Sequence, residues 1–164
     1  MIFTTLIVSD INKLKVRKMS NFNFSKRSVE RMQGVHPDLI VIFTEAIKTC
    51  PIDFGVPEFG GMRTKGEQNL LFKKGLSKCD GFDKISKHQL EYDDPYVNAL
   101  DFYAYISGKA SWDKVHLAIV ASTILSTATR LLKEGLIKIK IKWGATFGSS
   151  IFKGWDYPHI EIVV

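Results

Sequence analysis

The sequence has only two cysteines, Cys50 and Cys79, and they do not form a C-x-x-C pair. This scarcity excludes a disulfide framework and a zinc site made of thiolates. We expect both thiols to be buried and unlinked, as cysteines in globular proteins often are. The 12 glycines and 5 prolines are too few for a linker protein, and no internal repeat is present. The 164 residues, 45% of them hydrophobic, therefore predict one ordered domain with a core.

A recognisable export or membrane signal is also lacking. The apolar start, MIFTTLIVS, is followed rather than preceded by charges and is too short for a signal peptide or a membrane span. We therefore expect no signal peptide and no transmembrane segment. A second methionine, Met19, begins the segment MSNFNFSKRS. We therefore expect residues 1–18 to be an N-terminal extension that is disordered or contributes little to the fold, and residues 19–164 to form the domain.

The charge is not balanced, because 23 lysines and arginines stand against 17 acids and give a net charge of +6. Such a charge favours a polyanionic partner, and nucleic acid and an anionic cell wall both qualify. The basic residues are spread along the chain, however, and no aromatic and basic module of a nucleic-acid reader is present. We expect no specific nucleic-acid binding, and charge alone sets no function.

Hydrophobic periodicity predicts a mixture of helices and strands. Helices are expected over 25–33, 36–50, 67–74 and 112–134, and extended segments over 53–59, 98–105, 136–143 and 155–164. In the first helix Val29 and Met32 should share one side, and in the second an apolar stripe should face the core. Residues 76–96 form a long polar loop, and loops of that length are usually functional.

The four histidines differ in their surroundings. His36 precedes a helix and His116 lies within one, so we expect structural or solvated roles for both. His88 lies in the polar loop, and His159 follows Asp156 by three residues at the start of the terminal strand. Two histidines and one carboxylate are the ligand set of a catalytic zinc site that keeps a position for water. This spacing does not by itself establish such a site.

Asp101 is the strongest single clue, because it interrupts the apolar run NALDFYAY. An ionised carboxylate in a buried strand needs a cation or several hydrogen bonds. The sequence offers three partners: a metal ion, Arg63, or backbone N–H groups. A buried salt bridge or a capped aspartate therefore stays open as an alternative to a metal site.

Three motifs together resemble the zinc-site motifs of the D-Ala-D-Ala carboxypeptidase and L-alanyl-D-glutamate endopeptidase family, and phage endolysins within it in particular. They are Ser86-Lys87-His88, Ala99-Leu100-Asp101-Phe102 and Trp155-Asp156-Tyr157-Pro158-His159-Ile160-Glu161. The similarity extends from about Phe24 to the C-terminus. It includes the segments GVHPDL at 34–39, MRT at 62–64 and WG at 143–144.

The resemblance implies that zinc is bound by His88, Asp101 and His159. It also implies that Asp156 is the general base and that Arg63 steadies the substrate carbonyl as it becomes negative. For Arg63, a clamp on a substrate carboxylate and a structural ion pair stay open as alternatives.

Two residues are expected to support this site. Ser86 should hold the loop through a backbone bond or a bond to a metal ligand, and Gln68 should assist the site or bind substrate. Glu161 either does likewise or faces solvent.

The spacing of the first two ligands departs from the family. Members usually place six residues between the first histidine and the aspartate, whereas His88 and Asp101 are separated by twelve. Asp94, with five residues between it and His88, is therefore an alternative ligand. We prefer Asp101, because looping out residues 91–97 restores the usual geometry, and we expect the insertion to border the substrate groove.

The resemblance implies an α+β fold like that of the hedgehog and D-Ala-D-Ala peptidases, with helices packed on a small antiparallel sheet. It implies a monomeric zinc metallopeptidase that hydrolyses bacterial peptidoglycan stem peptides, at the L-alanyl-D-glutamate bond, as a phage endolysin that lyses its host. The protein would be made in the host cytoplasm and reach the cell wall after release by a holin. The alternatives are a D-Ala-D-Ala carboxypeptidase and a non-catalytic zinc-containing cell-wall-binding domain.

Overall fold

The computed structural model describes residues 21–91, 93–148 and 154–163. The expected extension over residues 1–18 lies outside these residues. The elements in chain order are α2 (Lys26–Arg31), α3 (Pro37–Thr49), β1 (Asp53–Gly55), α4 (Lys65–Lys73), β2 (Ala99–Asp101), β3 (Tyr103–Ile106), β4 (Lys109–Ser111), α5 (Lys114–Lys133), β5 (Lys140–Trp143), the short 3-10 helix η1 (Gly144–Thr146) and β6 (His159–Val163).

The strands form two three-stranded antiparallel sheets, with the orders β1-β3-β4 and β2-β6-β5. The α+β class is confirmed, but the expectation of one sheet is wrong. The apolar run 98–105 is not one strand, because it breaks at Phe102, whose N–H donates to Pro158 O at 2.9 Å instead of joining a ladder. The chain thus passes from one sheet to the other at a buried residue.

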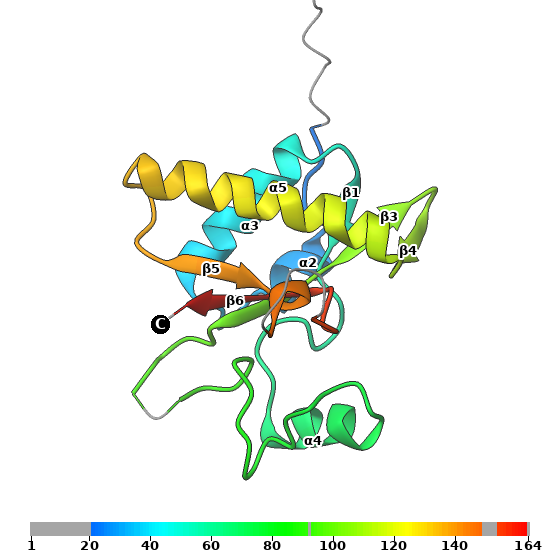
Figure 1. The fold of residues 1–164 in the computed structure, drawn as a ribbon, viewed down its shortest axis with the longest axis vertical. Coiled ribbons are helices and arrows are strands. Elements are labelled where there is room, and N and C mark those ends of the chain that lie inside the picture. Colours follow the sequence, from blue (N-terminus) through cyan, green and yellow to red (C-terminus); the bar gives the residue numbers. More distant parts are fainter. Residues whose placement is uncertain (1–20, 92, 149–153, 164) are drawn as a thin grey trace, which may run out of the picture.

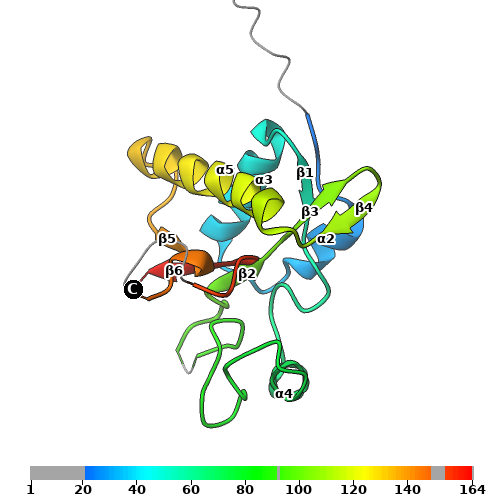
Figure 2. The same ribbon diagram turned by 45° about the vertical axis from the view of Figure 1, so that its right-hand side comes forward.

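The core lies where α3 and α5 pack on the sheets. In both views these two helices lie together on one side of β5 and β6, and α4 lies on the other side (Figure 1 and Figure 2). The predicted stripe of α3 is fully buried and consists of Leu39, Ile42, Phe43, Ala46 and Ile47. Helices at this spacing bury one apolar face because 3.6 residues make a turn.

Helix α5 is, within the described part of the chain, the one helix whose length and composition would allow it to cross a membrane. Its apolar face is instead part of the core, where Leu117, Val120, Ile124 and Leu131 are at most 2% exposed. Its N-terminus is fixed by the Asp113 carboxylate, which accepts from the N–H groups of Val115 and His116.

Several boundaries differ from the sequence expectations. Helix α2 is shorter, and the two residues expected to share one side differ in burial, since Val29 is 54% exposed and Met32 is buried. The strands β1, β5 and β6 are shorter than the extended segments predicted for them. Helix α4 begins earlier, because Thr64 and Glu67 form a capping box. Cys50 is buried, whereas Cys79 is only half-buried, and neither forms a disulfide.

Candidate metal centre and active-site cleft

The sheet β2-β6-β5 brings two of the expected ligands together. Strands β2 and β6 pair in antiparallel register, with Asp101 directly opposite His159. Directly opposed residues in an antiparallel pair project from the same face of the sheet. The Nδ1 atom of His159 consequently lies 3.0 Å from Oδ1 of Asp101. The backbone ladder thus brings together two residues that are 58 positions apart in the sequence.

His88 reaches the same point from the long loop. Its Nε2 atom lies 3.2 Å from Asp101 Oδ1 and 3.1 Å from His159 Nδ1. Within the described part of the chain, these three residues form the one group whose ligand atoms could surround a metal ion, and the atoms lie within 4.8 Å of one another. Asp94, the alternative ligand, does not belong to this group and accepts hydrogen bonds from Tyr96 N and Asn98 Nδ2.

The outer nitrogens of both histidines have fixed partners. His88 Nδ1 lies 2.8 Å from the carbonyl oxygen of Gly61, and His159 Nε2 lies 3.0 Å from Oε2 of Glu161. Each outer nitrogen must therefore donate its hydrogen, so that in the neutral form of either histidine the lone pair is on the inner nitrogen, directed at the centre. Histidines that bind metals almost always have such a bond to a carbonyl or carboxylate. This donor set fits a tetrahedral zinc site with one open position.

The charges of the site favour a cation at its centre. Burial opposes ionisation of Asp101, but His88 and Arg63 beside it hold the pKa of its carboxyl well below the usual range. Burial lowers the pKa of His88. Burial also opposes protonation of His159, yet hydrogen bonds with Asp101 and Glu161 raise its pKa to about 10. A metal must replace this proton on His159, so metal binding releases it.

Arg63 donates three hydrogen bonds beside the expected ligands. Its Nη2 pairs with Asp101 Oδ2, its Nη1 donates to Gln68 Oε1 at 3.1 Å, and its Nε donates to the Phe59 carbonyl. The side chain is 8% exposed. Gln68, which is fully buried, is in turn held by Ser77 Oγ at 2.7 Å and Cys79 O at 2.8 Å. Arg63 thus forms the ion pair that the sequence left open, and Gln68 orients Arg63.

Three consecutive carbonyl groups position the site, and sequence reasoning missed them. The Phe59 carbonyl accepts from Arg63, the Gly60 carbonyl accepts from Asp101 N at 2.8 Å, and the Gly61 carbonyl faces His88. Phe59 has a φ of 61°, a conformation that costs energy in a residue with a side chain. A Cβ atom on Gly61 would lie 2.1 Å from the Arg31 carbonyl oxygen. The adjacent Gly60-Gly61 pair was the signal in the sequence.

Asp156 lines the same cleft as the three ligands. Burial, reinforced by the nearby Asp101 charge, raises the pKa of its carboxyl to about 6. Its backbone lies against Gly144, where an added Cβ would be 2.2 Å from Asp156 O. At the Trp143-Gly144 motif two backbone segments therefore lie in close contact. This contact holds the segment that contains Asp156 next to the start of β6.

The comparisons with known proteins agree with this arrangement. The profile of the phage L-alanyl-D-glutamate peptidase family matches residues 19–163. The chain belongs to this family. It is 27% identical over 150 residues to an L-alanyl-D-glutamate peptidase of Escherichia phage T5, covering 87% of this chain and 99% of that one. The crystal structure of the Serratia marcescens L-Ala D-Glu endopeptidase ChiX matches with a TM-score of 0.65 and 25% identity, over 87% of this chain and 91% of that one.

The cleft of this peptidase has a volume of about 870 Å³. Its lining includes the aromatic residues Trp112, Phe147 and Trp155 and the lysines Lys78, Lys84 and Lys87. Ser86 lines the cleft as well, and its Oγ accepts from His88 N at 3.3 Å. Gln68 does not line the cleft and acts through Arg63.

The segment inserted between His88 and Asp101 begins and ends at neighbouring points of the backbone. Asn98 N donates to Lys87 O at 2.9 Å, so the intervening segment is looped out, as expected. No described residue of 89–97 lines the cleft, which contradicts the expectation that the insertion borders the groove.

The two other histidines lie outside the metal group, as expected. His36 caps α3 by accepting from Asp38 N at 3.1 Å, and His116 Nδ1 lies 2.8 Å from Ser111 Oγ. Both therefore have structural roles at the start of a helix.

Proposed function

We propose that this peptidase is zinc-dependent and hydrolyses the L-alanyl-D-glutamate bond of peptidoglycan stem peptides. The observation that carries the proposal is the convergence of His88, Asp101 and His159 beside Asp156 in one cleft, with both outer histidine nitrogens already committed to fixed partners. Family membership supplies the class of reaction, and the two relatives named above supply the bond.

Each protein group has a role that follows from its chemistry. Zinc, when bound, supplies Lewis acidity and lowers the pKa of a water molecule to about 7, so that hydroxide is available at neutral pH. Asp156, whose burial raises the pKa of its carboxyl to about 6, accepts the proton of the attacking water and passes it to the leaving amine. A zinc ion held by His88, Asp101 and His159 would oppose this rise in pKa and favour the ionised form of Asp156.

Arg63 acts in two ways in this proposal. Three of its N–H groups hold Asp101, Gln68 and the Phe59 carbonyl, and two of the five remain. The remaining donors face a carbonyl oxygen of the substrate as negative charge develops on it. Arg63 therefore orients a metal ligand and stabilises the transition state.

The rim of the cleft suits an acidic peptide. The lysines at 78, 84 and 87 lie on the side of the cleft formed by the loop that carries His88. A stem peptide carries the carboxylate of D-glutamate next to the cleaved bond, so these cations attract the part of the substrate that leaves with the new amine.

We also propose the biological setting that the resemblance implies. The protein is a monomeric endolysin, made in the cytoplasm of the infected bacterium, that reaches the peptidoglycan after a holin opens the membrane. A D-Ala-D-Ala carboxypeptidase and a non-catalytic zinc-containing wall-binding domain are the competing functions.

The experiment is digestion of purified peptidoglycan and of permeabilised Gram-negative cells by the wild type and Asp156→Ala. The wild type should release peptides that begin with D-glutamate, seen by mass, and Asp156→Ala should be slower by about a hundredfold or more because it lacks the base. Release of free D-alanine would favour the carboxypeptidase. Binding to the wall without any cleavage would favour the binding domain.

A further inference from the structure

Aromatic side chains form a row on the strand that follows Asp101. On β3, after the break at Phe102, Tyr103 and Tyr105 flank the fully buried Ala104. Alternate residues of a strand lie on one face, about 7 Å apart. Tyr103 and Tyr105 therefore project from the same face of β3.

Trp112 joins this row to the active-site cleft. Its ring centroid lies 5.9 Å from that of Tyr103, which lies 6.5 Å from that of Tyr105. Trp112 and Tyr105 are 53% and 42% exposed, although large aromatic side chains gain most when buried. Trp112 lines the cleft, whereas the two tyrosines line a second pocket of about 700 Å³. The row thus leads from the active-site cleft, at Trp112, into this second pocket.

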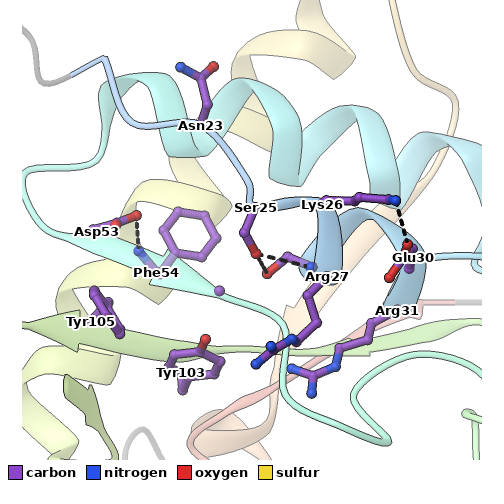
Figure 3. A pocket seen from close by; sticks show the side chains of 12 residues that line it. Asn23, Ser25, Lys26, Arg27, Glu30, Arg31, Asp53, Phe54, Tyr103 and Tyr105 are labelled. Carbon is purple, nitrogen blue, oxygen red and sulfur yellow. Dashed lines mark hydrogen bonds and ion pairs between the residues drawn. The ribbon is translucent and has the colours of Figure 1, made fainter. Parts of the chain in front are cut away.

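The second pocket combines the tyrosines with two arginines. Figure 3 shows the side chains of Arg27 and Arg31 extending from α2 toward β3, from which Tyr103 and Tyr105 project. Neither arginine forms an ion pair within the described part of the chain. Arg31 donates one hydrogen bond, to Val56 O at 2.8 Å. Most of the guanidinium donors are left for a ligand.

The acids of the pocket do not neutralise these arginines. Glu30 is 3.9 Å from Lys26 on the same helix. Asp53 accepts from the N–H of Phe54 at 2.8 Å, and burial raises the pKa of its carboxyl. The pocket therefore offers flat apolar rings beside cationic donors.

We propose that the aromatic row and the second pocket bind the glycan strand of peptidoglycan. This inference rests on the proposed function. In a stem peptide, L-alanine is joined directly to the lactyl group of the sugar, so the strand begins one residue from the cleaved bond. One extended residue spans about 3.5 Å. We place this first sugar at Trp112, which lines the cleft, and at Tyr103 beside it.

The chemistry of the row matches such a strand. The rings of Trp112, Tyr103 and Tyr105 offer flat surfaces for the apolar faces of sugar rings, with polar groups at their edges. The arginines supply planar donors to hydroxyl and acetamido oxygens, and to the carboxylates that neighbouring stem peptides add to the strand. The surface would hold the enzyme on the polymer while one stem peptide lies in the cleft.

The test compares two substrates of different size. Tyr105→Ala and Arg27→Ala, each of an exposed residue, are assayed on peptidoglycan and on a free stem peptide that lacks sugar. Phe72→Ala, on α4 outside both pockets and 43% exposed, is the matched control. Binding is measured separately, by co-sedimentation of the Asp156→Ala protein, with and without Tyr105→Ala, with peptidoglycan and with glycan strands stripped of peptides.

We expect Tyr105→Ala and Arg27→Ala each to lower kcat/KM on peptidoglycan about three- to tenfold, the size of one ring or charge contact, and to leave the free peptide unchanged. Sedimentation with stripped strands should fall by a similar factor. Equal losses on both substrates, or no loss on either, would overturn the glycan site. If wild type cleaves neither substrate while Tyr105→Ala still weakens sedimentation, the proposed function fails and the glycan site stands.

Discussion

The two halves of the metal centre are held in different ways. Asp101 and His159 lie opposite each other on β2 and β6, and a continuous backbone ladder fixes their separation. His88 and Arg63 lie in loops and are held by individual hydrogen bonds, among them those to the carbonyls of Gly61 and Phe59. In a backbone ladder several hydrogen bonds together fix the positions of the residues, whereas the position of a loop side chain depends on a few individual bonds.

This difference predicts two kinds of failure. Changes in the loop half should disturb both folding and metal binding, because the same carbonyls pack against the domain and orient the ligands. Changes around the sheet half should weaken metal binding and leave the fold intact. The four substitutions below test this contrast, from the largest expected effect to the smallest.

Gly61→Ala should have the largest effect. Its new Cβ would lie 2.1 Å from the Arg31 carbonyl oxygen, so the backbone must shift and carry the Gly61 carbonyl away from His88. We expect a loss of about 3 kcal/mol in the free energy of unfolding, together with weaker zinc binding. Chemical denaturation and a zinc titration measure the two. Gly66→Ala, in α4 with open space around it, is the control and should be neutral or stabilising by up to about 1 kcal/mol.

Glu161→Ala should weaken zinc binding about 10- to 100-fold without unfolding the protein, because His159 loses the carboxylate that orients it. Competition with a chelator measures the affinity. Glu161→Gln keeps an acceptor for His159 Nε2 and should lose less. Unchanged affinity in Glu161→Ala would show that the ladder alone orients His159.

Gln68→Ala should destabilise the domain by about 2 kcal/mol, since it leaves an Arg63 donor and the Cys79 carbonyl unpaired in a buried place. Asn69→Ala is the matched control, because this neighbouring half-buried amide donates to Asp80 O and forms no hydrogen bond with Arg63 among the described residues. Urea denaturation should separate the two variants. Equal losses would mean that the contact with Arg63 adds nothing.

Glu91→Ala in the insertion should have the smallest effect. Its ion pair with Lys87 is exposed, and such pairs contribute at most about 0.5 to 1 kcal/mol. Because no described residue of 89–97 lines the cleft, the cleavage products should also be unchanged. Product masses check this, and an altered cleavage preference would show that the insertion reaches the substrate.

The helices were predictable because their evidence is local. The apolar stripe of α3 and the proline at its first turn follow from residues within one or two turns, and the structure buries that stripe as predicted. The break at Phe102 was not predictable, since both sides of it are apolar and only the competing partners, β6 and β1, decide it. The exposure of Val29 likewise depends on what lies beside α2.

The candidate metal ligands could be named from sequence motifs, whereas the contacts that orient them could not. His88, Asp101 and His159 stand far apart in the sequence, and their meeting depends on strand register and on a looped-out insertion. The resemblance implied the ligand set, and looping out residues 91–97 was inferred from the strand pattern around Asp101, but the register was not predicted. The carbonyls of residues 59–61 could not be predicted, because a backbone oxygen carries no residue type; the Gly60-Gly61 pair marked only that the chain turns there.

The most direct test of the zinc site is the metal content of the purified protein and of Asp101→Asn, measured by elemental analysis. We predict one zinc ion for each wild-type chain and little in the variant, because the histidines alone cannot complete the site. No zinc in the wild type after reconstitution, or equal zinc in both proteins, would contradict the assignment of His88, Asp101 and His159 as its ligands.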